Sequence, residues 1–314
     1  MTALNDHRAV AHAIVAAHGL RFGAITAAAI SAGSFSSDDP VYRGAKQACT
    51  ALGFIEIDAD CLAQAWQAQT VRTGAFDAHQ WPETPADFGM RAFPPTERAD
   101  AFAPCPERLG LYAVLPDAQW VGRMARAGVP TVQLRFKSDD AAATEREVHA
   151  AVDAVRGTGA LLFINDHWQT AIAAGAYGVH LGQEDLDALA PAQVRQIRDA
   201  GLRLGVSTHG YAEMVRADAV SPSYIAMGAV YPTTLKRMAT APQGVARLAA
   251  YARLLRGYPQ VGIGGIDAQR LPEVLATGVG SVAVVRALVA AEDPEATAAQ
   301  WMAAMGAASA STKQ

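Results

Sequence analysis

The pattern of hydrophobic positions changes at about residue 109. From there, short apolar runs rich in β-branched residues alternate with longer Ala-rich segments in which apolar positions recur at helical spacing. Eight runs fit strands, at 111–115, 131–134, 160–164, 178–181, 203–206, 224–227, 261–263 and 281–285. Helices fit between them, for example at 119–127, 144–156, 191–200, 245–255 and 271–276. This alternation predicts an α/β fold, a parallel (β/α)8 TIM barrel. A doubly wound sheet is the alternative, but its glycine-rich nucleotide turn is missing after the first strand.

The first third of the sequence is organised differently. Helices are predicted at 7–18, 41–52 and 59–70, with a short strand at 54–57. Prolines and aromatic residues punctuate 72–107, and we expect a linker whose Trp81, Phe88 and Phe93 dock on a neighbouring surface. The predicted organisation is a small, mainly helical N-terminal accessory region of unknown function (1–71), the linker (72–107), the barrel (108–306) and a tail (307–314).

Composition narrows the class of protein. Hydrophobic residues make up 51% of the 314 residues and charged residues 18%, with a net charge of −4. This balance is typical of a globular protein and argues against nucleic acid or a membrane surface as a partner. The three cysteines match no metal or redox motif, which favours reduced thiols in a cytoplasmic protein. The N-terminus shows no signal-peptide pattern. A homo-oligomer is left open.

The end of the second predicted strand carries a distinctive polar face. Gln133, Arg135 and Lys137 are spaced two apart, so they share one side of an extended chain. A planar guanidinium and an ammonium beside an amide favour a ligand with several anionic oxygens. An edge strand with a solvated polar face is the alternative.

Two carboxylates follow the next two strands. Asn165 and Asp166 end the third strand, and Asp185 follows the fourth. Because strand C-termini meet at one end of a barrel, the two Asp residues beside the cationic second strand predict a Mg²⁺ site. Taken singly, each Asp could equally be the N-cap of the following helix.

The ends of the later strands add residues to this first site and also supply a second anion site. Ser207 ends the fifth strand and can donate a hydrogen bond to a phosphate oxygen, although it could also be a helix cap. The sixth strand leads to Thr233, Thr234 and Lys236, and the seventh to Gly265, where backbone N–H groups can approach a ligand. The eighth ends at Arg286. We predict that the first site, to which Ser207 and Lys236 also belong, binds a diphosphate together with the metal. The second site, formed by Thr233, Thr234, Gly265 and Arg286, is predicted to bind a monophosphate.

Six motifs together resemble the thiamine phosphate synthase family over residues 108–305. They are Gln133-Leu134-Arg135-Phe136-Lys137, Ile164-Asn165-Asp166, Gly178-Val179-His180-Leu181-Gly182-Gln183-Glu184-Asp185, Gly205-Val206-Ser207-Thr208-His209, Ala241-Pro242-Gln243-Gly244 and Ile263-Gly264-Gly265-Ile266. The resemblance implies a Mg²⁺-dependent transferase of thiamine biosynthesis with two small-molecule substrates. It would join 4-amino-2-methyl-5-(diphosphooxymethyl)pyrimidine to a thiazole monophosphate, giving thiamine monophosphate and pyrophosphate. Whether the thiazole carries a carboxylate is left open.

The resemblance also implies roles for individual residues. The implied catalytic set is Arg135, Lys137, Ser207 and Lys236, and the implied metal ligands are Asp166 and Asp185. The implied pyrimidine-diphosphate ligands are Gln133, Arg135, Lys137, Asn165, Ser207 and Lys236. The implied thiazole-phosphate ligands are Thr233, Thr234 and Gly265, and Leu134, Phe136, Leu235, Val285 and Arg286 complete the substrate-binding set. The implied mechanism is dissociative: pyrophosphate leaves first, and no protein nucleophile is required.

Two departures from the family pattern both fall on the thiazole-phosphate side. Leu235 stands where the family usually has a second Thr, and Arg286 where it usually has Ser. Arg286 could bind phosphate, fill the pocket or select another substrate. Two other functions therefore stay open, a thiazole tautomerase-like isomerase and a non-catalytic protein that binds the pyrimidine diphosphate. The Asp166–Asp185 pair counts against the isomerase, which has little use for a metal–diphosphate site.

Overall fold

The computed structural model describes residues 6–23, 35–233 and 241–311. The chain divides into two compact units. The first comprises Met1–Phe93 and Gly210–Ala219, and the second comprises Pro94–His209 and Val220–Gln314. Residues 24–34 and the predicted site residues Thr234, Leu235 and Lys236 lie outside the described residues. The predicted linker at 72–107 divides between the two units after residue 93.

The second unit contains a closed eight-stranded barrel with strands in the order β1 to β8, every neighbouring pair parallel. The strands are β1 Leu111–Leu115, β2 Thr131–Leu134, β3 Leu161–Asn165, β4 Gly178–Leu181, β5 Arg203–Thr208, β6 Tyr224–Met227, β7 Gln260–Ile263 and β8 Ser281–Val284. The predicted TIM barrel is thus confirmed, with each strand within two residues of its expected bounds. Because all strands are parallel, their C-termini lie on one rim of the barrel.

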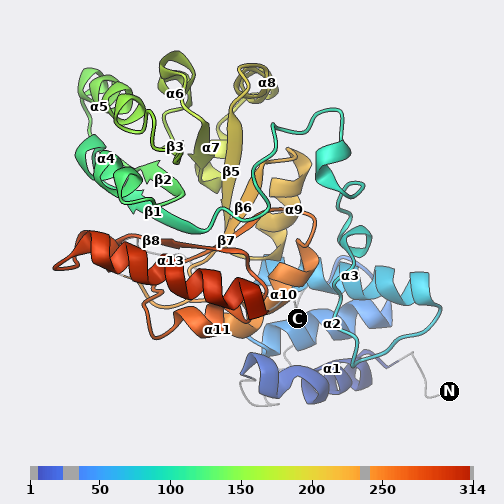
Figure 1. Cartoon of the computed structure of the whole chain (residues 1–314). Helices are drawn as coiled ribbons and strands as arrows, with labels where there is room; N and C mark the ends of the chain where they lie inside the picture. The colour runs from blue at the N-terminus through green and yellow to red at the C-terminus, as the bar shows by residue number, and fades with distance from the viewer. Residues whose placement is uncertain (1–5, 24–34, 234–240, 312–314) are drawn as a thin grey trace. The chain divides into compact units, whose positions relative to one another are not determined.

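Helices follow the strands as the sequence pattern indicates (Figure 1). They are α4 Ala118–Arg126, α5 Ala141–Ala154, α6 Trp168–Ala174, α7 Gln183–Asp187, α8 Pro191–Asp199, α10 Gly244–Leu254, α11 Leu271–Leu275, α12 Arg286–Val289 and α13 Pro294–Ser311, with a short 3-10 helix, η3 Pro95–Glu97, before the barrel. Helix α13 continues through Ser311, into the segment expected as a tail. None of the described helices is long and apolar enough to cross a bilayer.

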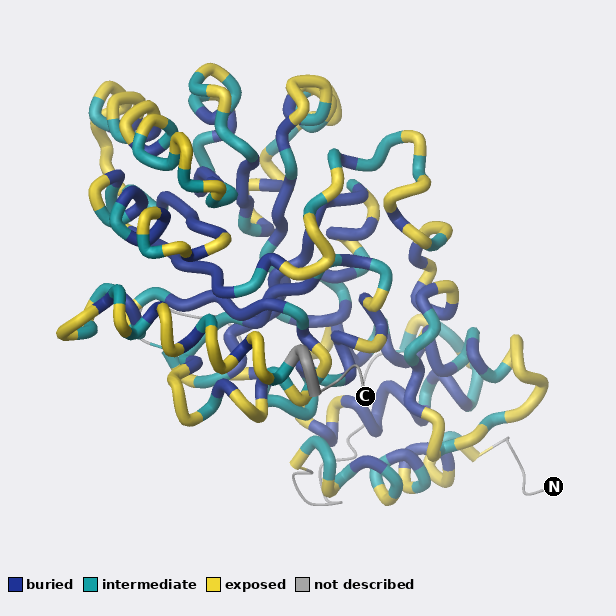
Figure 2. Tube along the Cα trace, viewed as in Figure 1, coloured by how far each residue is buried: buried dark blue, intermediate teal, exposed yellow. Residues whose placement is uncertain are grey.

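The barrel interior is packed with side chains rather than open. Its buried cluster consists of Leu109, Tyr112, Val114, Phe163, Tyr224, Ala226, Val261 and Ala283. Figure 2 shows the strands as buried and the outward faces of helices such as α5 as exposed. Gly205 makes room for the ring of Tyr224, because a Cβ there would lie 2.1 Å from Tyr224 Cζ.

The first unit is helical, with α1 His7–Phe22, α2 Pro40–Ala51, α3 Glu56–Thr73 and a 3-10 helix, η2 Pro85–Phe88. The strand predicted at 54–57 is wrong, because α3 begins at Glu56. Phe54 is buried by aromatic packing instead of sheet pairing: its ring centroid lies 5.8 Å from that of Trp81, in a stacked arrangement. A run of four residues is too short for its apolar character to separate a strand from a packed turn.

Helix α9, Tyr211–Ala219, lies between β5 and β6 in sequence but belongs to the first unit. Asp58 Oδ1 on α3 accepts a hydrogen bond from the Ala212 amide over 2.9 Å. Trp81 Nε1 donates to the Tyr211 hydroxyl over 2.9 Å, and Phe88 stacks on the same ring at 5.3 Å. Trp81 and Phe88, expected in a linker, are therefore buried parts of this helical unit.

Candidate active site

The C-terminal ends of β2 and β3 carry the predicted charged residues on the same rim. The Arg135 amide donates to the Leu115 carbonyl over 2.7 Å, and the Asp166 amide donates to the His180 carbonyl over 3.0 Å. Each residue thus extends the parallel ladder by one bond beyond its strand. This regular pairing fixes where the side chains emerge, as the sequence pattern predicts.

Lys137 and Asp166 form an ion pair at this rim. Lys137 Nζ donates to Asp166 Oδ2 over 2.7 Å, and both side chains are accessible to solvent. Asp166 has a φ of 64°, in the left-handed region that non-glycine residues seldom adopt. It is not the N-cap of α6, because that position is His167 and makes no side-chain cap bond. Residues with such an unusual backbone conformation are often found at functional sites.

Asp185 lies in the first turn of α7 and its carboxylate is close to that of Asp166. Its Oδ2 accepts from the Gly182 amide over 3.3 Å, so it does satisfy the helix terminus as a capping residue would. Burial raises the pKa of Asp185, and the negative charge of Asp166 raises it further. A carboxylate whose ionisation is disfavoured by a neighbouring carboxylate fits a divalent cation, whose charge would relieve the repulsion.

The chemistry of this donor set suits Mg²⁺ in particular. Within the described ranges, no group of three or more His, Cys, Asp or Glu residues could hold a metal by itself. Mg²⁺ commonly binds one or two carboxylates and completes its octahedron with water and substrate phosphate. The Asp166–Asp185 pair therefore fits an ion that arrives with a phosphorylated ligand.

The remaining residues of the second predicted strand differ in how they can reach a ligand. Leu134 is buried and alternates with Gln133, so its side chain faces away from the barrel interior. Arg135 and Phe136 are half-buried. In the described part of the chain, the Arg135 guanidinium makes no hydrogen bond or ion pair, so it can bind an anion.

Below the rim, six polar side chains form a continuous hydrogen-bond network, which we call the interior network. In order they are Asn165, Gln133, Tyr112, Tyr224, His180 and Ser207, from strands β3, β2, β1, β6, β4 and β5. Both of its ends are predicted ligand-binding residues. The four members between them are buried.

The bonds of the interior network are all short. Gln133 Nε2 donates to Asn165 Oδ1 over 2.7 Å, and the Tyr112 hydroxyl donates to Gln133 Oε1 over 2.9 Å. The Tyr112 and Tyr224 oxygens are 2.7 Å apart. His180 Nδ1 lies 2.7 Å from the Tyr224 oxygen, and its Nε2 lies 2.8 Å from Ser207 Oγ.

Burial controls the protonation of this network. Desolvation lowers the pKa of His180 to about 4, against an opposing effect of the Asp166 carboxylate, so the ring is neutral at pH 7. The pKa values of Tyr112 and Tyr224 are raised by burial, so both hydroxyls keep their hydrogens. The sequence prediction gave these three residues no role. Strand alternation was the available signal, since Tyr112, His180 and Tyr224 lie on inward positions of their strands.

The predicted thiazole-phosphate side is described in part. Gly265, at φ 64°, packs so closely that a Cβ there would lie 2.5 Å from the Pro232 carbonyl oxygen. Thr233 and Val285 are half-buried, and Val285 packs against the interior cluster. Arg286 is exposed at the start of α12, directly after β8 ends on the rim. Gly265 and Arg286 thus follow neighbouring strands, as expected.

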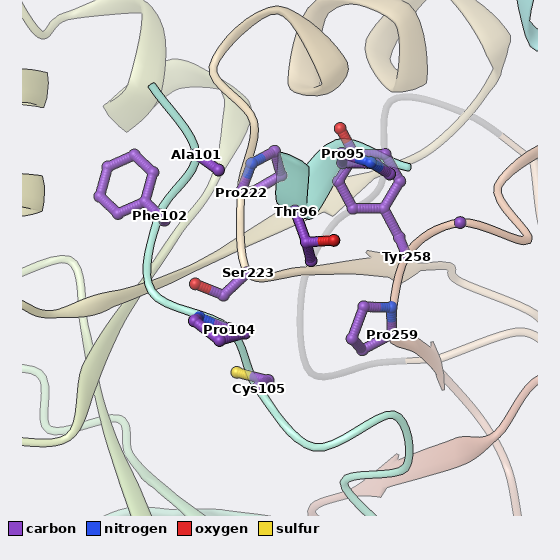
Figure 3. A pocket seen from close by; sticks show the side chains of 11 residues that line it. Pro95, Thr96, Ala101, Phe102, Pro104, Cys105, Pro222, Ser223, Tyr258 and Pro259 are labelled. Atoms are coloured by element: carbon purple, nitrogen blue, oxygen red, sulfur yellow. The ribbon is translucent and has the colours of Figure 1, made fainter. Parts of the chain in front are cut away.

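A small cavity at the other end of the barrel cannot hold a substrate. It measures about 20 Å³ and lies among residues that precede β6 and β7, including Ser223, Tyr258 and Pro259, with Pro104 and Cys105 beside them (Figure 3). This volume accommodates about one water molecule. This cavity therefore does not compete with the rim of strand C-termini as a site for a phosphorylated ligand.

Comparison with known proteins agrees with this geometry. The family model described as thiamine monophosphate synthase matches residues 111–288. The chain belongs to this family. The match spans β1 to α12, which includes every residue of the interior network and both carboxylates of the rim.

Individual relatives support the same assignment. A thiamine-phosphate synthase of Neisseria meningitidis is 54% identical over 195 residues, covering 62% of this chain and 94% of the relative. One from Cronobacter sakazakii is 54% identical over 192 residues, covering 61% and 90%. Among solved structures, thiamine phosphate pyrophosphorylase from Pyrococcus furiosus is similar with a TM-score of 0.55 and 27% identity, covering 63% and 96%. The family match does not extend to α1–α3.

Proposed function

We propose that this protein is a thiamine phosphate synthase. It joins 4-amino-2-methyl-5-(diphosphooxymethyl)pyrimidine to a thiazole monophosphate and releases thiamine monophosphate and pyrophosphate. The observation that carries the proposal is the cluster of Lys137, Asp166 and Asp185 on one rim of the barrel, within a chain of this family. Cys49, Cys61 and Cys105 are not joined in disulfides, which supports a cytoplasmic location.

The diphosphate site combines cations with a metal position. Asp166 and Asp185 would hold Mg²⁺, which supplies positive charge to the diphosphate when it is bound. Arg135 and Lys137 bind the diphosphate oxygens and stabilise the charge that develops as pyrophosphate leaves. Gln133, Asn165 and Ser207 bind the same substrate, and Lys236 is proposed to join them on sequence grounds.

The reaction needs positioning more than a reactive protein group. The electron-rich aminopyrimidine stabilises the methylene cation left by pyrophosphate departure, and the thiazole nitrogen captures that cation. The residues of the second site, with Thr233, Gly265 and Arg286 in the described part, hold the thiazole phosphate so that its nitrogen faces the cation. Holding the two reactants in this geometry supplies much of the acceleration.

A coupling assay tests the proposal. Full-length protein with both substrates and Mg²⁺ should release pyrophosphate and form thiamine monophosphate in equal amounts, and chelation of the metal should stop both. Absence of turnover in protein that binds the pyrimidine diphosphate and is folded by circular dichroism would reject an enzyme and leave a binding protein. Conversion of a thiazole tautomer without the pyrimidine would point instead to an isomerase.

A further inference from the structure

The interior network connects two predicted ligand-binding residues, and its hydrogens can be assigned by counting. Tyr112 has one hydroxyl hydrogen and donates it to Gln133 Oε1. The bond between the two tyrosines must therefore use the hydrogen of Tyr224, with Tyr112 as acceptor. Tyr224 then has no hydrogen left for His180.

The same count fixes the histidine tautomer. Because Tyr224 can only accept, His180 Nδ1 must carry the ring hydrogen and donate it. Both ring nitrogens of His180 are hydrogen-bonded to hydroxyl groups, which can either donate or accept. A neutral ring with one hydrogen therefore satisfies both bonds. In a neutral imidazole Nε2 is then an acceptor, and the hydrogen it receives is that of Ser207.

The consequence appears at the two ends of the network. Asn165 accepts through Oδ1, so its Nδ2 hydrogens remain for a ligand. Ser207 gives its hydrogen inward, so only lone pairs remain on Oγ. Gln183 Nε2 donates to the Ser207 carbonyl over 2.8 Å, and the buried Gln183 Oε1 has no partner among the described residues.

We propose that Tyr112, Tyr224 and His180 are positioning residues that fix the direction of this network. They make the Asn165 end a donor to an anionic oxygen and the Ser207 end an acceptor for an N–H or O–H group of the ligand. The proposal rests on the proposed function for its ligand. That ligand offers two such donors near a diphosphate, the amino group of the aminopyrimidine and a water molecule on Mg²⁺. Ser207 thus accepts a hydrogen bond from one of these donor groups and does not donate one to a phosphate oxygen.

The histidine tautomer gives a direct test. Nitrogen NMR of histidine-labelled full-length protein reports which ring nitrogen carries hydrogen, and His180→Asn identifies the resonance. In the wild-type protein, Nδ1 of His180 should carry the hydrogen and Nε2 should carry none. Tyr224→Phe removes the acceptor of Nδ1 and should move the hydrogen to Nε2, with Tyr112→Phe as a second variant if the first does not fold.

A matched variant controls for the loss of any buried hydroxyl. Tyr258→Phe removes a buried tyrosine hydroxyl that accepts from Arg98, outside the interior network, and should leave the His180 resonances unchanged. The proposal is overturned if wild-type Nε2 carries hydrogen. It is equally overturned if the folded Tyr variants keep the wild-type nitrogen shifts.

Calorimetry separates the two donors. If the amino group is the donor, Ser207→Ala should weaken binding of the aminopyrimidine alcohol about fivefold to tenfold. If the donor is metal-bound water, Ser207→Ala should instead weaken binding of magnesium pyrophosphate by a similar factor. Tyr224→Phe should raise KM for the pyrimidine diphosphate by about the same factor with little change in kcat. Equal weakening of metal-free pyrophosphate by Ser207→Ala would show a hydroxyl that donates to phosphate, against the proposal.

Failure of this inference can be distinguished from failure of the proposed function. The NMR measurement needs no substrate and no turnover. A wild-type protein that forms thiamine monophosphate but carries hydrogen on His180 Nε2 rejects only the inference. A protein with the expected tautomer but no turnover rejects only the function.

Discussion

Lys137 Nζ and Asp166 Oδ2 lie 2.7 Å apart at the rim of the barrel, so a carboxylate proposed to bind Mg²⁺ also holds the cation proposed to bind the diphosphate. A divalent ion that shares Asp166 would therefore reorganise this pair. The ion pair positions Lys137 in the free protein, and the proposed diphosphate would offer the ammonium a second partner once the metal is bound.

Replacement of Lys137 tests its role in charge stabilisation. Lys137→Gln should lower kcat by about 100-fold, because a cation at the leaving group acts mainly in the transition state. The melting temperature should stay near the wild-type value, since exposed ion pairs contribute little to stability. Pyrophosphate release and differential scanning calorimetry measure the two effects, with Lys137→Arg as the charge-conserving control. A variant with wild-type kcat would exclude Lys137 from the chemistry.

The raised pKa of Asp185 predicts a pH-dependent stability. The folded state favours the protonated carboxyl more than the unfolded state does. This contribution is complete below the ordinary pKa of an aspartate and is lost as pH rises through the raised value. Asp185→Asn cannot ionise, so without metal at pH 7 it should be more stable than wild type, by less than about 1 kcal/mol for a solvent-screened group. The difference should vanish in acid.

Urea denaturation from pH 3 to pH 8 measures this difference, and addition of Mg²⁺ supplies the complementary result. The ion should raise the melting temperature of wild type more than that of Asp185→Asn. Asp187→Asn, on the same helix, serves as the control and should respond to Mg²⁺ as wild type does. Equal responses of Asp185→Asn and wild type would remove Asp185 from the metal site.

Gly205 is predicted to tolerate no side chain. An alanine Cβ there would lie 2.1 Å from Tyr224 Cζ and 2.3 Å from its hydroxyl oxygen, and the ring is fully buried. Gly205→Ala should destabilise the protein by about 1–3 kcal/mol in urea denaturation. Gly262→Ala on β7 is the matched control, because its nearest neighbour would be 3.5 Å away. Equal stabilities of the two variants would contradict this packing.

Arg286 is expected to bind the thiazole phosphate. Arg286→Ser restores the residue usual in the family and should raise KM for the thiazole phosphate about tenfold, the loss of roughly one charge-assisted hydrogen bond. Steady-state kinetics of pyrophosphate release measure this. Arg195→Ser, at an exposed position of α8, controls for the loss of a surface charge. A faster variant with unchanged KM would mean that Arg286 obstructs the site.

Asp58 is expected to stabilise the first unit through helix α9. Asp58→Ala removes the acceptor of the Ala212 amide and should lower the free energy of unfolding by about 1–2 kcal/mol. Asp58→Asn keeps an acceptor oxygen and should lose less. Chemical denaturation followed by tryptophan fluorescence is suitable because Trp81 is hydrogen-bonded to Tyr211 at the start of the same helix. Identical stability of Asp58→Ala and wild type would exclude a capping role.

The amino-acid sequence alone determined the barrel and its rim. Each apolar run is short and contains a β-branched residue, so the predicted strands at 111–115, 131–134, 178–181 and 224–227 coincide with β1, β2, β4 and β6. A parallel barrel then requires Arg135, Asp166 and Asp185 to share one end, whatever the details of packing. The strand prediction at 54–57 failed because three apolar residues around Glu56 suit a packed turn as well as a strand.

Only the tertiary structure decided which side chains meet inside. Tyr112 and Tyr224 are 112 positions apart in sequence, and their hydroxyls meet because the barrel closes and Gly205 leaves room for a ring. The tautomer of His180 depends on those contacts, and the place of α9 in the first unit depends on Asp58 and Trp81. Local periodicity encodes the elements, but contacts between distant residues arise only from how those elements pack.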